Sequence, residues 1–156
     1  MSADNQQERL RTIGWIVGFT DGEGCFSVSI FKNKTAKIGM QVMPEFVITQ
    51  GKKSLYALEE IQNFFQCGKI YINHRYDNHH EHLYRYCVRS LRDLKEKIIP
   101  FFEQNPLRTA KNKDFQRFKK AIGMMDAKMH LDIDGVEQIR SLQRFENPQR
   151  PHAESR

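Results

Sequence analysis

The chain has 156 residues, of which 39% are hydrophobic, and this length and composition are typical of a single domain with its own core. Lys and Arg number 25 against 19 Asp and Glu, so a polyanion such as nucleic acid is the first candidate for a partner, although charge alone fits an ordinary basic protein equally well. Three widely spaced cysteines exclude a disulfide framework and a cysteine zinc site. Because no apolar run reaches about 20 residues and no targeting signal is evident, we expect an intracellular protein without a membrane partner, in a bacterial cytoplasm or in a chloroplast or mitochondrion.

The first predicted element is a helix over residues 6–20. Its apolar residues, among them Leu10, Ile13 and Val17, form a surface wider than one stripe. Gly14 and Gly18 lie four residues apart and therefore on one face, although each glycine costs about 1 kcal/mol in a helix interior. A close approach by a second helix would offset that cost. The alternative is that Gly18 merely ends the helix.

Two strands are predicted next, over residues 25–33 and 38–48, joined as a hairpin by the polar segment 33–37. Even-numbered positions such as Phe26, Val28 and Phe46 are apolar, and most odd-numbered positions are polar, so the two faces of the hairpin differ. Pro44 interrupts the second strand and predicts an edge position or a bulge there.

The second half of the chain repeats this order. Residues 53–66 have helical apolar spacing, and residues 69–76 and 83–89 alternate as strands. Ser90 with Asp93 resembles a capping pair for a helix that runs to Pro100, and further helices are predicted over residues 112–129 and 132–145, the last capped by Asp132. We therefore expect one domain over residues 6–146 with loose termini at 1–5 and 147–156.

This order of elements predicts an α+β fold. Its α-ββ-α-ββ-α core forms a four-stranded antiparallel sheet with helices on the apolar face, and further helices follow at the C-terminus. The polar and basic face of the sheet suits the major groove of DNA, where Arg pairs with guanine, Asn or Gln with adenine and Glu with cytosine. The alternative is a solvated face without a partner. The residues that we expect to contact DNA are Ser27, Ser29, Phe31, Asn33, Lys37, Gln41, Met43, Glu45, Tyr71, Asn73, Arg75, Arg85, Arg89 and Lys113.

The segment that decides the class is Ile16–Gly24, with the sequence IVGFTDGEG, which ends the first helix and enters the first strand. Asp21 and Glu23 stand at the end of the helix, where the helix macrodipole disfavours carboxylates. Acidic residues beside glycines indicate a site for a hard cation, because Mg²⁺ takes one or two carboxylates together with carbonyl, water and phosphate oxygens. Taken alone, however, the D-G-E-G tetrapeptide is more often a turn.

The whole segment resembles the LAGLIDADG motif at each constrained position. The departures are Val17 in place of the usual Ala, Thr20 in place of an aliphatic residue, and Glu23 in place of the commoner Asp. The resemblance covers roughly residues 10–145 and includes the ITQ end of the second strand and the segment IIPFFEQNPLRTAKNKDF. The chain thus resembles the LAGLIDADG homing endonucleases of the single-motif, homodimeric class, and this resemblance implies a saddle-shaped DNA-binding sheet.

The resemblance also implies a function. A protein of this class would make a double-strand break in a near-palindromic DNA site of about 20 bp by metal-dependent phosphodiester hydrolysis, and would promote mobility of the intron that encodes it. The chain has one copy of the motif, which implies a homodimer. The residues implied for the dimer interface are Gly14, Trp15, Gly18, Phe19 and Asp21.

The catalytic residues implied by the resemblance are Glu23, Gln50 and Lys111. Glu23 and the carbonyl of Gly22 would bind Mg²⁺, with Mn²⁺ expected to substitute and Ca²⁺ expected to support binding without cleavage. Gln50 would orient water, and Lys111 would stabilise charge at the scissile phosphate, unless it is an ordinary surface lysine. Whether Lys52 or Lys53 replaces a second basic residue of the family is left open.

Two other functions are compatible with the sequence. The first is an RNA maturase that helps the host intron RNA to splice, and the second is a DNA-binding regulator that has lost cleavage. The intact Glu23 argues against the regulator, whereas the sequence leaves the maturase open. His74, His79, His80 and His82 match no zinc spacing, so we expect them at a hairpin tip near DNA phosphates.

Overall fold

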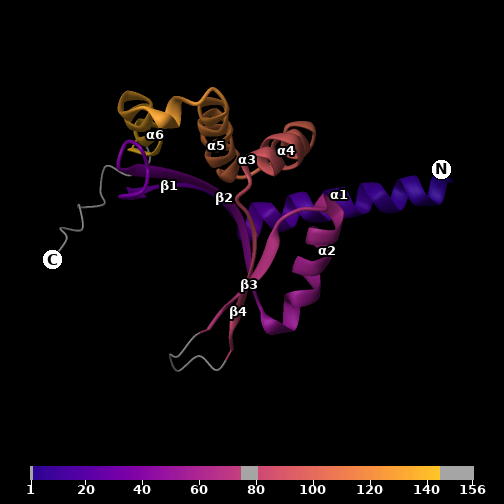
Figure 1. The fold of residues 1–156 in the computed structure, drawn as a ribbon. Coiled ribbons are helices and arrows are strands. Elements are labelled where there is room, and N and C mark those ends of the chain that lie inside the picture. The colour runs from indigo at the N-terminus through magenta and orange to yellow at the C-terminus, as the bar shows by residue number, and fades with distance from the viewer. Residues whose placement is uncertain (1, 75–80, 145–156) are drawn as a thin grey trace.

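A curved four-stranded antiparallel sheet with helices along one side makes up the fold (Figure 1). The structure, a computed structural model, describes residues 2–74 and 81–144. Helix α1 (Ala3–Glu23) leads into the strands β1 (Gly24–Lys32) and β2 (Met40–Gly51); helix α2 (Leu55–Phe65), preceded by a 3-10 turn at Lys52–Ser54, leads into β3 (Lys69–Asn73) and β4 (Leu83–Val88). The strand order β1-β2-β4-β3 confirms the predicted fold class and sheet.

The remaining helices are α3 (Leu91–Asp93), α4 (Ile99–Gln104), α5 (Lys111–Asp126) and α6 (Ile133–Arg144). A π turn at Leu94–Ile98 joins α3 and α4 into one helical run, and a 3-10 turn at Met129–Leu131 precedes α6. In the described ranges, no helix has both the length and the apolarity needed to cross a membrane.

Helix α1 is longer than the sequence pattern predicts. Ser2 caps it, because its Oγ accepts a hydrogen bond from the N–H of Asn5 at 3.4 Å, and this satisfies one of the free donors of the first turn. Residues 3–5, predicted to be loose, are therefore helical. At the other end the helix includes Glu23, so both acidic residues of the motif lie in its last turn.

Pro44 lies in a regular stretch of β2. It pairs with Val28 in an unbroken β1–β2 register, so the bulge that the sequence offered as one alternative is wrong. The pairing of β2 with β4 begins only at Phe46, so Pro44 has a neighbouring strand on one side only. A residue without an N–H is tolerated there, which agrees with the predicted edge position.

Pro100 does not end its helix, and this corrects the predicted boundary, because the helical run continues to Gln104. A proline inside an α-helix removes one hydrogen bond and brings its ring against the carbonyl four residues earlier. The π turn at Leu94–Ile98 lies directly before it, and its wider hydrogen-bond spacing gives room for the ring.

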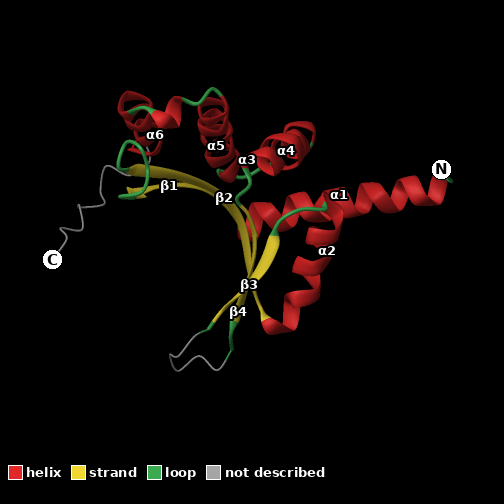
Figure 2. Ribbon diagram, viewed as in Figure 1, coloured by secondary structure: helices red, strands yellow, loops and turns green. Residues whose placement is uncertain are grey.

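The core lies on the face of the sheet formed by even-numbered residues. Phe26 and Phe46, which face each other across β1 and β2, stack with ring centroids 4.9 Å apart, and Phe102 from α4 packs edge-on against both. Figure 2 shows all the helices on the outer, convex side of the sheet. The odd-numbered face therefore forms a concave surface that no described helix covers.

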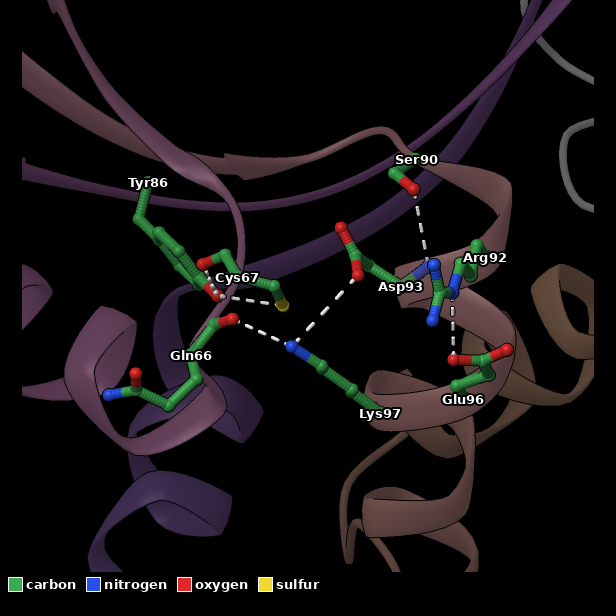
Figure 3. Close-up of polar contacts among 8 residues, drawn as sticks. All are labelled: Gln66, Cys67, Tyr86, Ser90, Arg92, Asp93, Glu96 and Lys97. Atoms are coloured by element: carbon green, nitrogen blue, oxygen red, sulfur yellow. Dashed lines mark hydrogen bonds and ion pairs between the residues drawn. The ribbon is translucent and has the colours of Figure 1, made fainter.

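A polar network joins the end of α2 to β4 and to the helix after it (Figure 3). Gln66 ends α2 in the left-handed conformation, and its carbonyl accepts a hydrogen bond from Lys97 Nζ at 2.6 Å. The hydroxyl of Tyr86 donates to the carbonyl of Cys67 at 3.0 Å, and burial raises the pKa of this phenol. The Oγ of Ser90 accepts from the N–H of Asp93 at 3.2 Å, which confirms the predicted cap.

Gly68, three residues after the end of α2, is required by this arrangement. Its φ of +78° favours glycine, and an added Cβ would lie 2.6 Å from the Tyr86 ring and 2.8 Å from the carbonyl of Cys87. We expect Gly68→Ala to lower the free energy of unfolding by about 2–4 kcal/mol, through backbone strain and overpacking. Urea denaturation followed by circular dichroism would measure this change.

Gly123→Ala is the matched control. Gly123 lies inside α5, and an added Cβ there would meet nothing within 4 Å, so we expect a gain of about 0.5–1 kcal/mol from helix propensity. Equal stability of the two variants would contradict the role of Gly68.

Candidate functional site

The end of α1 carries an exposed acidic side chain. Glu23, the last residue of the helix, is exposed, and no hydrogen bond or ion pair engages its carboxylate within the described residues. Gly22 is also exposed, with nothing within 4 Å of its Cβ direction. An unpaired carboxylate beside an open backbone is therefore available to a ligand outside this chain.

Asp21, two residues earlier, is fully engaged by its own chain. Its Oδ2 accepts a hydrogen bond from the N–H of Arg108 at 2.8 Å, and its Oδ1 accepts from the N–H and the hydroxyl of Thr109 at 3.2 and 2.7 Å. Burial raises the pKa of this carboxyl, but these hydrogen bonds outweigh burial, and the net pKa lies below its ordinary value. The carboxylate thus joins α1 to the segment that precedes α5. Its predicted place in a dimer interface stays a prediction.

Lys111, the first residue of α5, reaches the same corner of the molecule. Its Nζ donates a hydrogen bond to the carbonyl of Gly24, the residue after Glu23. The Oγ1 of Thr109, held by Asp21, accepts from the N–H of Lys111 at 3.2 Å. The fold therefore holds Lys111 against the backbone directly after Glu23, and the catalytic roles of both residues stay predictions. Lys113, which the sequence predicts to contact DNA, is exposed about half a turn further along α5.

Gln50 lies at the same end of the sheet as the acidic tip. Gly24 pairs with Ile48 across β1 and β2, and Gln50 is two residues further on, opposite Tyr84 of β4. It is half-buried, and no described hydrogen bond joins its amide to Glu23 or Lys111. Its catalytic role therefore stays a prediction.

Lys52 and Lys53 follow Gln50 and are both exposed. They line one groove together with Glu81 and His82, so both lysines are placed where a second basic residue could act. The N–H of Lys53 donates to Glu81 Oε1 at 3.2 Å, which fixes the backbone of this turn.

The concave face carries the residues predicted to contact DNA. The strand register places on this face Ser27, Ser29, Phe31, Gln41, Met43, Glu45, Tyr71, Asn73 and Arg85, with Arg89 one residue past the end of β4. Asn33 and Lys37 lie in the turn between β1 and β2, and Lys113 lies on α5. Arg75 lies outside the described residues. Contact with DNA stays a prediction for all of them.

Within two separate groups of predicted contact residues, the side chains are hydrogen-bonded to one another. In the β1–β2 turn, the amide nitrogen of Asn33 donates to the Gln41 side-chain oxygen at 2.6 Å. At the centre of the concave face, Glu45 is buried and accepts hydrogen bonds from Arg85 and Arg89. The carboxylate of Glu45 is therefore already engaged within the chain, whereas the predicted contact with cytosine would need it free.

The histidines form no cluster with metal-binding geometry in the described ranges. The rings of His74 and His82 lie edge to face with centroids 4.8 Å apart, and His79 and His80 lie outside the described residues. Within residues 2–74 and 81–144 no group of three or more His, Cys, Asp or Glu side chains is close enough to share a metal ion.

One face of α1 is left uncovered. An added Cβ at Gly14 or Gly18 would meet nothing within 4 Å, and Leu10 on the same face is 61% exposed. Trp15 and Phe19 are half-buried, with ring centroids 5.4 Å apart. No described helix makes the close approach that the two glycines predict. This face is therefore open to contact from outside the described part of the chain.

Comparison with known proteins agrees with this fold and this motif. Residues 16–122 match the profile of the LAGLIDADG endonuclease family. The probable intron-encoded endonuclease 3 of Neurospora crassa is 33% identical over 132 residues, which are 83% of this chain and 24% of that protein. The crystal structure of the homing endonuclease I-TnaI has a TM-score of 0.78 at 38% identity, and the match covers 88% of this chain and 89% of that chain.

A third relative has been solved with DNA and metal. I-SmaMI bound to an uncleaved DNA target in the presence of calcium ions has a TM-score of 0.77 at 30% identity over 86% of this chain and 44% of that chain. The chain belongs to the LAGLIDADG endonuclease family. It spans only about a quarter to a third of the length of the first curated relatives that it matches.

Two functional contacts escaped the sequence analysis. The three hydrogen bonds to Asp21 come from residues almost 90 positions later, and no local signal announces them. The pairing of Glu45 with two arginines could be predicted only from the register of β2 against β4. Phe46 lies opposite Val88 in that register, so Glu45 and Arg89 extend the same ladder by one position. Opposite charges at facing strand positions would have been the signal, once that register was known.

We expect Asp21→Asn to weaken the junction between α1 and the 108–111 segment. An amide cannot accept all three hydrogen bonds, so the free energy of unfolding near neutral pH should fall by about 1 kcal/mol. Because folding lowers the pKa of Asp21, the stabilisation is complete above the unfolded pKa of about 4 and is lost as the pH falls through the folded pKa. Denaturation of both proteins from pH 7 to pH 3 would measure a difference that shrinks below pH 4.

Glu60→Gln on α2 is the control, because it removes an exposed carboxylate of α2. A difference between Asp21→Asn and the wild type that stays constant down to pH 3 would contradict the assigned role of the Asp21 carboxylate.

Proposed function

We propose that this protein is a site-specific homing endonuclease that acts as a homodimer. It makes a double-strand break in a near-palindromic DNA site of about 20 bp and promotes mobility of the intron that encodes it. The observation that carries this proposal is the exposed carboxylate of Glu23 at the end of α1, with Lys111 held against the next backbone carbonyl, beside a concave sheet face lined with arginines and amides. The family membership and the DNA-bound relative I-SmaMI support it.

The residues at the end of α1 fit a divalent cation. Glu23 presents a carboxylate without a partner in the described part of the chain, and Gly22 leaves its backbone open to approach. These two residues would hold Mg²⁺, with Mn²⁺ as a substitute, and a bound cation of this kind neutralises phosphate charge and lowers the pKa of water. The calcium ions in the I-SmaMI complex with uncleaved DNA support the expectation that Ca²⁺ permits binding without cleavage.

The chain's own side chains supply the remaining functions. Lys111 places a positive charge next to Glu23, where it would stabilise the charge that develops on a scissile phosphate. Asp21 fixes the backbone that carries Lys111 and would keep this charge in place during the reaction. Gln50, at the same end of β2, would hold a water molecule through its amide.

A second copy of the chain is the partner that fits the open face of α1. Helix interiors tolerate glycines such as Gly14 and Gly18 at a cost of about 1 kcal/mol each, and the close approach of a partner helix would offset it. Two-fold packing along this face would bring both copies of Glu23 to the symmetry axis and produce a near-palindromic site. The match to 89% of I-TnaI but 44% of I-SmaMI supports the view that this domain is one half of a complete enzyme.

We expect Glu23→Gln to retain DNA binding and to lose cleavage by at least about 100-fold, because the amide cannot replace the charge of a metal ligand. A DNA target selected by the wild type from a randomised palindromic pool would serve as substrate. Cleavage would be followed with Mg²⁺, and binding would be followed with Ca²⁺.

Glu59→Gln, which removes an exposed carboxylate on α2, is the control and should cleave normally. Wild-type cleavage by Glu23→Gln would refute the assignment of Glu23, and loss of DNA binding by this variant would contradict a purely catalytic role.

We expect Gly18→Leu to raise the dissociation constant of the dimer by about 100-fold or more, because the leucine side chain fills the space that a partner helix needs. The folded chain itself should not lose stability, since leucine favours a helix and its Cβ would meet no atom within 4 Å. Sedimentation equilibrium would measure the dimer, with Gly123→Leu on α5 as the control. A wild-type protein that is monomeric on its DNA target would contradict the proposal.

A further inference from the structure

The buried carboxylate on the concave face is that of Glu45, which is 8% exposed although it lies on the polar side of the sheet. Its Oε1 accepts a hydrogen bond from Arg85 Nη2 at 3.0 Å, and its Oε2 accepts from Arg89 Nε. The side chain of Glu45 is 11% exposed, against 36% for Arg85 and 42% for Arg89. The carboxylate therefore lies beneath the two guanidinium groups, and the arginines are the charges that a ligand on this face would meet.

The contact with Glu45 leaves the two terminal nitrogens of the Arg89 guanidinium group available to a ligand. Glu45 takes the Nε of Arg89, and no described contact takes either of its terminal nitrogens. The guanidinium carbon lies 5.6 Å from the centroid of the Tyr71 ring, so the aromatic face limits its movement on another side. A guanine base offers two acceptors, N7 and O6, to the two terminal nitrogens of an arginine.

We propose that Glu45 is a positioning residue that fixes Arg89 for recognition of guanine in the DNA target. This inference rests on the proposed function, since it concerns how the same surface selects its DNA. It replaces the expectation that Glu45 itself accepts a hydrogen bond from cytosine.

The physical reason is pre-organisation. A free arginine side chain loses rotamer freedom when it binds a base. When a buried carboxylate already holds the arginine, that freedom has been lost during folding and is not lost again on binding. The hydrogen bond that Arg89 donates to Glu45 also raises the pKa of Arg89, which agrees with a tight charge-assisted pair. Without the carboxylate, this face becomes more positive. Its sequence-independent affinity for DNA phosphates should therefore stay equal or increase, while its selectivity for guanine falls.

The test compares Glu45→Gln and Glu45→Asp with Arg89→Ala. Each variant would be incubated with a randomised double-stranded DNA pool in the presence of Ca²⁺, and the base preferences of the bound molecules would be read by sequencing. We expect the preference for guanine, at the position that Arg89→Ala affects, to fall about tenfold in both Glu45 variants. The double variant Glu45→Gln with Arg89→Ala should show no larger fall than Arg89→Ala alone. Glu59→Gln, which removes an exposed acid from α2, should leave the preferences unchanged.

A measurement without DNA tests the contact itself. In the NMR spectrum of the free wild-type protein, the Nε proton of Arg89 should exchange slowly with water, and in Glu45→Gln it should exchange rapidly. Thermal denaturation would verify that the variants are folded. Fast exchange in the folded wild type would overturn the proposal.

The binding experiment with DNA distinguishes a failure of the proposed function from a failure of the positioning role of Glu45. A wild-type protein that enriches no sequence overturns the proposed function and, with it, the reading of bases by Arg89. A wild-type preference for guanine that Glu45→Gln and Glu45→Asp both retain overturns the positioning role alone. A change of preference at a base pair that Arg89→Ala leaves intact also overturns it, because Glu45 would then contact a base directly.

Discussion

The hydrogen bonds that Asp21 accepts from Arg108 and Thr109 are the contact on which the arrangement of the site depends. They join the end of the first helix to a segment almost 90 residues later. This junction places Lys111 against the carbonyl of Gly24, and it leaves Glu23 pointing away from the core into open space. The motif thus divides its two acids between different tasks: the first is satisfied by backbone N–H groups, and the second stays available for chemistry.

The two acids differ in how much the sequence can predict about them. The helix macrodipole disfavours both carboxylates at this end, and acidic residues beside glycines therefore indicate a cation site there. For Asp21, donors from a distant segment remove that cost within the chain. Local sequence contains no information on such donors, whereas the exposed position of Glu23 follows from its place at the end of the helix.

The periodicity of apolar residues in the sequence predicts most of the fold. The alternation of apolar and polar residues correctly separated the core face, with Phe26 and Phe46, from the concave face. It failed at boundaries that depend on tertiary contacts, such as the continuation of the helix through Pro100, which a π turn permits. It also could not show that Glu45 and Arg89 face each other, because strand pairing between distant segments is fixed by the whole sheet.

The same alternation affects how such a protein can change over evolution. Side chains that hold the fold and side chains that meet the outside share strands but point to opposite faces, so the concave surface can drift while the hydrophobic interior is untouched. On the proposed function, single replacements at positions such as Ser29 or Gln41 would give access to new DNA targets. Glu45 is the exception, because one replacement there releases two arginines at once and forces a concerted rather than a stepwise path.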